Sequence, residues 1–185
     1  MSLTLERSIP NLTLDTCLNA PSTEATFTVE TTRFGKMEAE EEAVLTLPEG
    51  VIGFEKCQRY ILVRQEENSS FRWLQSLERP ELAFPILEPR DFRPDYAPTI
   101  SDSDARVLQI TAETPVLMFS VITVPAKDPQ GMTANLLGPI IVNGFTRQGK
   151  QVIVLDEEFT TRHSVIAELK RSQERLERMV EEQAA

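Results

Sequence analysis

Prolines and glycines divide most of this chain into short segments rich in residues that favour β-strands. The sequence has 12 prolines and seven glycines, and many of them separate runs of β-branched and aromatic residues. These strand-like runs are residues 26–31, 43–47, 60–63, 71–74, 82–87, 106–111, 116–124, 139–142 and 151–155. Short strands separated by frequent turn signals are typical of a sandwich or a barrel. The sequence therefore predicts a mainly β fold, a small β-barrel or sandwich-like domain.

The pattern changes to that of a helix near the C-terminus. Ile166, Leu169, Leu176 and Val180 follow a heptad-like spacing that Gln173 completes, with charges of both signs on the other faces. We predict one amphipathic α-helix over residues 161–182. It either packs on its own β-core or buries its apolar stripe against a partner or a second copy.

The chain divides into three parts on this pattern. Residues 1–25 form an irregular N-terminal extension, residues 26–160 form the β domain, and residues 161–185 form the C-terminal helix. The helix belongs to the same globular unit or serves as a partner or dimer helix, so we expect a monomer or a weak homodimer. Alternating leucines in the extension, beginning with Leu3 and Leu5, leave open that it adds an edge strand.

Charge and cysteine content limit the classes of function. The formal net charge is −10, which argues against direct nucleic-acid binding and favours a basic protein partner or simple solubility. Cys17 and Cys57 are the only cysteines and His163 is the only histidine, too few for a zinc framework. No signal peptide or membrane-spanning stretch is visible. We expect a cytoplasmic protein without metal, cofactor or membrane association.

Catalytic motifs are also missing from the sequence. His163 has no flanking nucleophile motif, and no phosphate-binding, dinucleotide-binding or zinc-protease fingerprint occurs. The three consecutive acids Asp156, Glu157 and Glu158 are better explained as charges that stabilise a following helix N-terminus than as a glycosidase pair. We therefore predict no catalytic residues.

Seven segments, in this order along the chain, resemble the family of the flagellar assembly factor FliW. They are residues 30–35 (ETTRFG), 47–55 (LPEGVIGFE), 74–76 (LQS), 84–86 (FPI), 94–96 (PDY), 135–143 (NLLGPIIVN) and 151–154 (QVIV). The resemblance runs from about Val29 to Ser164. The N-terminal extension and the longer terminal helix depart from the usual pattern of the family.

The resemblance implies a non-catalytic regulator that works by binding proteins. Proteins of this family bind CsrA, an RNA-binding translational repressor, and relieve its repression of flagellin synthesis. They also bind flagellin, so that the two partners exchange on one regulator. Two alternatives stay open: a flagellin chaperone that does not bind CsrA, and a small β-barrel enzyme or ligand carrier.

One group of residues is our hypothesis for the partner site. The acidic run Glu38, Glu40, Glu41 and Glu42 is expected to form an exposed turn between two strands, which attracts a basic partner. To it we add Asp95, Tyr96 as an amphipathic anchor, and Asn135 as a group that bonds to backbone. Glycines and aromatic residues in the same motifs, such as Gly50 and Phe54, are assigned to the fold.

Overall fold

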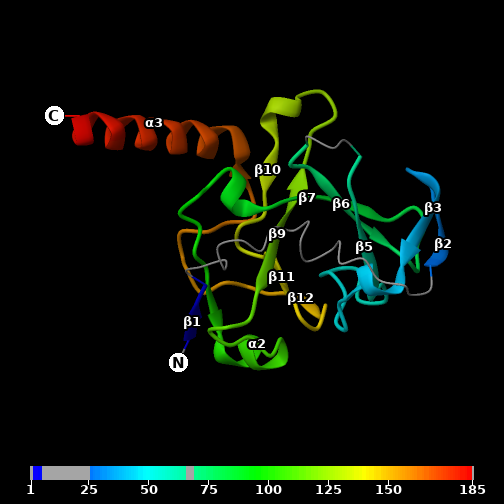
Figure 1. The fold of residues 1–185 in the computed structure, drawn as a ribbon. Coiled ribbons are helices and arrows are strands. Elements are labelled where there is room, and N and C mark those ends of the chain that lie inside the picture. Colours follow the sequence, from blue (N-terminus) through cyan, green and yellow to red (C-terminus); the bar gives the residue numbers. More distant parts are fainter. Residues whose placement is uncertain (1, 6–25, 66–68, 185) are drawn as a thin grey trace.

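The computed structural model describes residues 2–5, 26–65 and 69–184, with side chains described as far as residue 178 (Figure 1). Its main element is an antiparallel sheet in which neighbouring strands follow the order β12-β11-β9-β7-β6-β5-β4. The strands of this path are β12 (Gly149–Gln151), β11 (Ile140–Asn143), β9 (Val116–Thr123), β7 (Ala83–Leu87), β6 (Arg72–Ser76), β5 (Arg59–Val63) and β4 (Leu45–Thr46). Beside the path, β10 (Thr133–Ala134) pairs with β9 and with β13 (His163–Ser164).

The sheet curls until its two ends meet at a single point. Thr46 of β4 forms an isolated parallel bridge with Gln148, and its amide donates to the carbonyl of Arg147 at 3.0 Å. One bridge is not a ladder, so the sheet is not a closed barrel. The prediction of a mainly β, sandwich-like domain with a C-terminal helix is confirmed.

Strand β9 is buried on both faces because its side chains alternate between two cores. Leu117 and Phe119 pack inside the curled sheet with a cluster that includes Tyr60, whereas Met118 and Ile122 pack outward into a second cluster. Such two-sided burial explains why this run is mostly apolar rather than alternating between apolar and polar residues.

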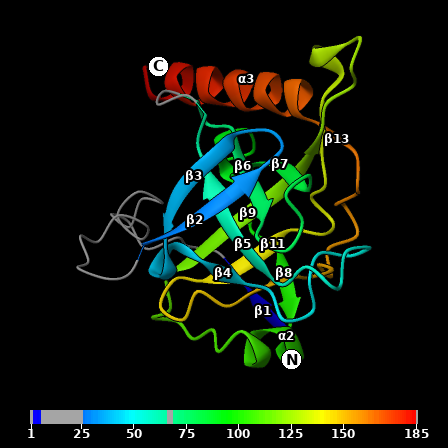
Figure 2. The same cartoon turned by 90° about the vertical axis from the view of Figure 1, so that its right-hand side faces the viewer.

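A hairpin covers the outer face at the other end of the sheet. Strands β2 (Thr26–Thr31) and β3 (Gly35–Glu40) form this hairpin, which lies in front of β5 and β6 in Figure 2. Val29 packs with Ile61 and Val63 in a third core cluster, against which Trp73 also lies. The strand predicted at residues 26–31 is confirmed, but Glu38 and Glu40 of its partner β3 were expected to lie in a turn.

The described part of the N-terminal extension is not irregular. Strand β1 (Ser2–Thr4) pairs antiparallel with β8 (Thr99–Ser101), and Leu5 is buried in the second core cluster. The edge strand that the alternating leucines left open is therefore present at Leu3. The rest of the predicted extension, residues 6–25, including Leu12, Leu14 and Cys17, lies outside the described residues.

Residues 106–111, predicted as a strand, instead contain the end of helix α2 (Asp102–Val107) and a turn. Ser101 caps the helix by accepting a hydrogen bond from the amide of Asp104 at 3.1 Å, and Asp102 and Asp104 add negative charge to the first turn. Capping and charge at the N-terminus outweigh the modest strand preference of this segment. Short 3-10 turns occupy Glu41–Ala43 (η1), Pro89–Asp91 (η2) and Pro129–Gly131 (η3).

The C-terminal helix α3 (Val165–Ala184) begins four residues later than predicted. His163 and Ser164 are held in β13 by pairing with β10, and the Ser164 hydroxyl accepts a hydrogen bond from the Ala167 amide at 3.3 Å. Strand pairing thus prevents the helix from starting at Thr161. No helix in residues 2–5, 26–65 and 69–184 is long and apolar enough to span a membrane.

We expect the replacement Tyr96→Phe to destabilise the fold. The Tyr96 hydroxyl donates to the Leu136 carbonyl at 2.6 Å in a fully buried setting. Losing it leaves a buried acceptor unpaired, which costs about 1–3 kcal/mol in the free energy of unfolding. Urea unfolding measures this loss.

Ser120→Ala is the matched control for this loss. Its hydroxyl is also fully buried but has no hydrogen-bond partner among the described residues. Its removal is expected to change stability by no more than about 0.5 kcal/mol or to raise it. Equal losses for the two variants would contradict the role given to the Tyr96 hydroxyl.

Candidate protein-binding surfaces

The loop of residues 47–55 is a series of tight turns that only glycine permits. Gly50 has a φ of +68°, and a Cβ at this position would approach the Phe54 carbonyl oxygen to 2.5 Å. Its amide donates to the Leu47 carbonyl at 2.8 Å, and the Phe54 amide donates to Val51 at 2.7 Å. Gly53, with a φ of +88°, makes the next reversal. These turns leave the side chain of Ile52 62% exposed.

The side chain of Gln151 ties this loop to a second turn. Its carbonyl oxygen accepts a hydrogen bond from the Ile52 amide at 3.0 Å, and its amide nitrogen donates to the Gly138 carbonyl at 2.9 Å. The Gly138 amide in turn donates to the side-chain oxygen of Asn135 at 2.9 Å. Three segments far apart in the sequence are thereby fixed to one another by one chain of hydrogen bonds.

An apolar depression, which we call the Ile52 groove, lies over this junction. One part encloses about 350 Å³, with Val51, Ile52, Phe84, Val121, Leu137 and Ile153 among its lining residues. An adjoining part of about 490 Å³ shares Ile52 and Gln151 and has Glu49 and Glu55 on its rim. Because Ile52 and Ile153 are 62% and 52% exposed, the groove presents apolar surface that a partner could cover.

The rim of the Ile52 groove carries negative charge. The Glu55 carboxylate accepts a hydrogen bond from the Gly53 amide at 2.9 Å. Hydrogen bonds from its own amide and from that of Gly53 lower the pKa of Glu55 below its ordinary value. Glu49 lies 2.9 Å from the Lys150 ammonium. The groove therefore combines apolar anchoring positions with an acidic edge whose charge Lys150 partly balances.

The four glutamates of the predicted acidic turn do lie together, but on a strand and a 3-10 turn. Glu38 and Glu40 belong to β3, where the alternate residues Met37 and Ala39 face the core. Glu41 and Glu42 follow in η1, and Glu41 is bound by Arg59. We call these four glutamates the acidic hairpin. The expectation that all four lie in a turn is wrong, because alternating inward residues place Glu38 and Glu40 in a strand. Arg59 partly balances the charge of Glu41.

The other predicted site residues lie elsewhere. Asp95 binds Arg175 of α3 at 2.7 Å and therefore lies at the root of that helix. Tyr96 is fully buried, with its ring 4.7 Å from that of Phe159, so the role of an exposed anchor does not fit it. Asn135 is half-buried at the Ile52 groove, where it holds a turn. The structure does not bring these residues together with the acidic hairpin.

A buried arginine organises the ion pairs beneath α3. Arg93 is 4% exposed, and its guanidinium lies 2.7 Å from Glu158 and 3.4 Å from Glu168. It also lies over the ring of Phe159, 4.8 Å from the ring centroid. Glu158 thus pairs with Arg93, whereas we expected it to stabilise a helix N-terminus. Helix α3 is fastened to the β domain through this side chain.

The titratable groups that were tested for chemistry are engaged in structural contacts. The ring of His163 accepts a hydrogen bond from the Thr160 amide at 2.9 Å and lies 3.2 Å from Glu168. Both carboxylate oxygens of Asp156 accept hydrogen bonds from Thr99. In the part of the chain that the structure describes, no three His, Cys, Asp or Glu side chains are placed to hold a metal ion.

Sequence reasoning missed Ile52 and Ile153 as surface residues. Ile153 lies in the apolar run 151–155, which was predicted as a strand, and Ile52 lies in a motif that was assigned to the fold. The one available signal was the pair of glycines around Ile52, since a reversal on both sides of a residue favours pushing its side chain outward.

We expect Gln151→Met to loosen the Ile52 groove without unfolding the domain. The replacement keeps the length of the side chain but removes two hydrogen bonds, which lowers the free energy of unfolding by about 1–3 kcal/mol. Hydrogen exchange at the Ile52 amide should accelerate more than exchange in β9. Unchanged exchange at Ile52 would show that Gln151 does not hold the loop.

Comparison with known proteins matches the described domain to one family. The profile described as "FliW protein" matches residues 28–165. The flagellar assembly factor FliW of Bdellovibrio bacteriovorus is 38% identical over 141 residues, which cover 76% of this chain and 80% of that protein. The protein of the same name from Leptospira biflexa is 38% identical over 139 residues, covering 75% of this chain and 91% of that protein.

A solved structure agrees with these sequence matches. The crystal structure of a flagellar assembly factor FliW superposes with a TM-score of 0.69 at 31% sequence identity, covering 75% of this chain and 96% of that one. The profile match spans the hairpin, the curled sheet and the Ile52 groove, and ends at the start of α3. The chain belongs to the FliW family.

Proposed function

We propose that this protein is a non-catalytic, cytoplasmic flagellar assembly factor that binds the translational repressor CsrA and antagonises its repression of flagellin synthesis. It also binds flagellin, so that the two partners exchange on it. The proposal rests above all on one feature of the surface. The segments that carry the family resemblance at residues 47–55, 135–143 and 151–154 converge on the Ile52 groove, an apolar surface held in place by Gln151.

The groove has the properties of an anchoring site. Ile52 and Ile153 are exposed, but the backbone at each is held by hydrogen bonds. The Ile52 amide donates to Gln151, and the amides on either side of Ile153 donate to the carbonyls of Pro139 and Leu137. When a partner covers them, this protein loses little conformational entropy. Most of the free energy gained by burying the apolar area therefore contributes to affinity. Burying one such side chain fully contributes about 1.5–3 kcal/mol.

Negative charge accounts for the choice of partner. The acidic rim of the groove, Glu49 and Glu55, and the acidic hairpin favour a protein with basic side chains next to an apolar anchor. An RNA-binding repressor fits this description because its own function requires basic residues. The acidic hairpin mainly speeds association, and the groove supplies most of the affinity.

Relief of repression needs only a moderate coupling. If bound regulator weakens RNA binding by CsrA a hundredfold, the coupling free energy is about 2.7 kcal/mol. By reciprocity, RNA weakens the binding of this protein to CsrA by the same factor.

A flagellin chaperone that does not bind CsrA is the second candidate, since the apolar groove alone also suits an unassembled flagellin segment.

We expect Ile52→Asp to weaken CsrA binding by roughly 30-fold or more, because a charge then replaces an apolar anchor. Calorimetric titration into CsrA from the same organism measures the effect. Phe145→Asp is the control. Phe145 is 72% exposed but follows the C-terminal end of β11, whereas Gly138 at the groove precedes the N-terminal end of that strand. Equal losses in both variants would exclude the groove. No binding by folded wild-type protein would exclude CsrA and leave flagellin to be tested in the same way.

Reversing charge on the acidic hairpin is expected to slow association rather than abolish binding. The variant Glu38→Lys/Glu42→Lys leaves the Glu41–Arg59 pair intact and should lower the association rate constant roughly tenfold at low salt. Stopped-flow fluorescence at several salt concentrations measures the rate. The difference should shrink as ionic strength rises.

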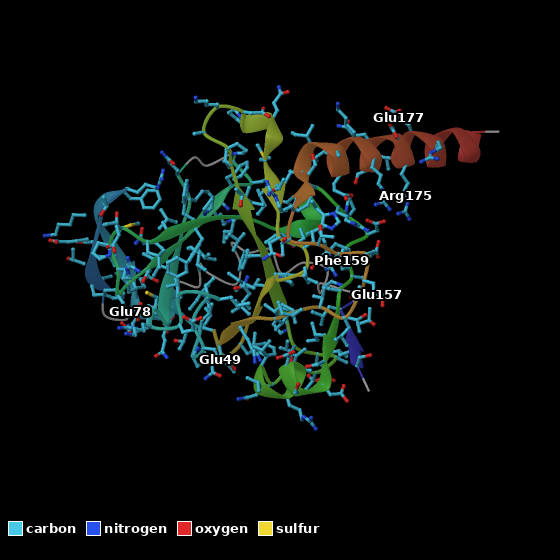
Figure 3. The ribbon with its side chains drawn as sticks, turned by 180° about the vertical axis from the view of Figure 1, so that it is seen from behind. Glu49, Glu78, Glu157, Phe159, Arg175 and Glu177 are labelled. Atoms are coloured by element: carbon cyan, nitrogen blue, oxygen red, sulfur yellow. The ribbon has the colours of Figure 1, made fainter. Side chains whose placement is uncertain are left out.

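A matched variant separates local steering from total charge. Glu113→Lys/Glu157→Lys changes the net charge by the same amount at other exposed positions, and Glu157 lies on the α3 side of the molecule, away from Glu78 and the hairpin (Figure 3). It should slow association less. Equal slowing by the two double variants would assign the effect to net charge alone.

A further inference from the structure

Helix α3 leaves the β domain halfway along its length. Its first turns are docked, with Val165 buried and the Ser172 hydroxyl donating to the Phe92 carbonyl at 3.1 Å. From residue 173 to residue 178 every side chain is exposed, and the helix extends away from the sheets (Figure 1). Among side chains of the described residues, the last ion pair to the domain is that of Arg175 with Asp95.

An apolar stripe continues from the docked half onto the projecting half. Leu169 packs against the second core cluster, whereas Leu176, two turns further on, is 64% exposed. A cavity of about 370 Å³ lies along the stripe, lined by Pro94, Asp95, Glu168, Arg171, Ser172, Arg175 and Leu176. Apolar helix surface is therefore present beside a hollow at the root of the helix.

We propose that this surface binds the same surface of a second copy, with the two α3 helices antiparallel. The two-fold axis passes between Gln173 and Leu176, so that each of these residues packs on the other in the partner copy. The hollow beside Ser172 of each copy then lies next to the projecting half of the second helix.

Charge complementarity selects this orientation. Lys170 and Glu177 directly follow Leu169 and Leu176, so both flank the stripe on the same side. In the antiparallel pair, Lys170 of each copy faces Glu177 of the other, which gives two attractive contacts. Both side chains are exposed. In a parallel pair these positions would face Val165 and Ser172, which carry no charge and offer no such contact.

The pairing is expected to be weak and reversible. Only about three turns of each helix project from the domain, and a stable protein interface usually buries about 1,200–2,000 Å² in total. A pair of short helix segments buries less than that. We therefore expect a dissociation constant of roughly 10–1,000 µM. This inference does not depend on the proposed binding of CsrA or flagellin.

Sedimentation velocity of the full chain at rising concentration tests the pairing. Wild-type protein should shift from monomer to dimer, and Leu176→Asp should remain monomeric. Val107→Asp is the control, because Val107 is 54% exposed on α2, at the opposite end of the molecule from α3 (Figure 1). Wild-type protein that stays monomeric at about 1 mM, or equal weakening by both variants, would overturn the proposal.

A charge exchange tests the orientation. Lys170→Glu and Glu177→Lys should each weaken self-association roughly tenfold, because each places like charges opposite one another twice. An equimolar mixture of the two variants should dimerise at least as well as wild-type protein, since both contacts are then attractive. A mixture no stronger than either variant alone would exclude the antiparallel pair.

Discussion

The two-sided burial of strand β9 is the constraint on which the rest of the molecule depends. Leu117 and Phe119 fill the inside of the curled sheet, while Met118 and Ile122 build the core on its outside. A strand with apolar side chains on both faces must be covered on both faces. The curl of the sheet covers one face. Strand β8, helix α2 and the root of α3 cover the other, which brings segments distant in the sequence to the same strand.

The Ile52 groove follows from the way the connections must run around this strand. The loop of residues 47–55 and the turn at residues 135–138 both reach the same rim of the sheet, and Gln151 hydrogen-bonds to each. A side-chain amide can accept from one backbone and donate to another, which neither a carboxylate nor an aliphatic side chain can do. The groove thus results from the hydrogen bonds by which Gln151 pairs backbone groups of the other two segments.

The sequence predicted what depends on local periodicity and missed what depends on pairing across the chain. The run at residues 116–124 and the helix around Leu169 and Leu176 were correctly identified. Residues 38–42 were taken for a turn because they carry four glutamates, although Met37 and Ala39 alternate with Glu38 and Glu40 toward the core. Tyr96 was placed at the surface because its hydroxyl suits an interface, yet the same hydroxyl suits a buried carbonyl equally well. Only tertiary contacts separate these alternatives.

Exposed apolar residues lower solubility. When the backbone beneath such a residue is held rigidly, its exposure indicates a function. Ile52 would be less exposed if the loop were free to collapse onto the sheet, but Gly50 permits only a narrow turn and the Ile52 amide is bonded to Gln151. The fold therefore keeps this side chain outward at the expense of apolar burial within the monomer. A protein that covered the groove would recover that burial. An exposed apolar side chain on a restrained loop accordingly indicates a binding surface more strongly than one on a flexible loop.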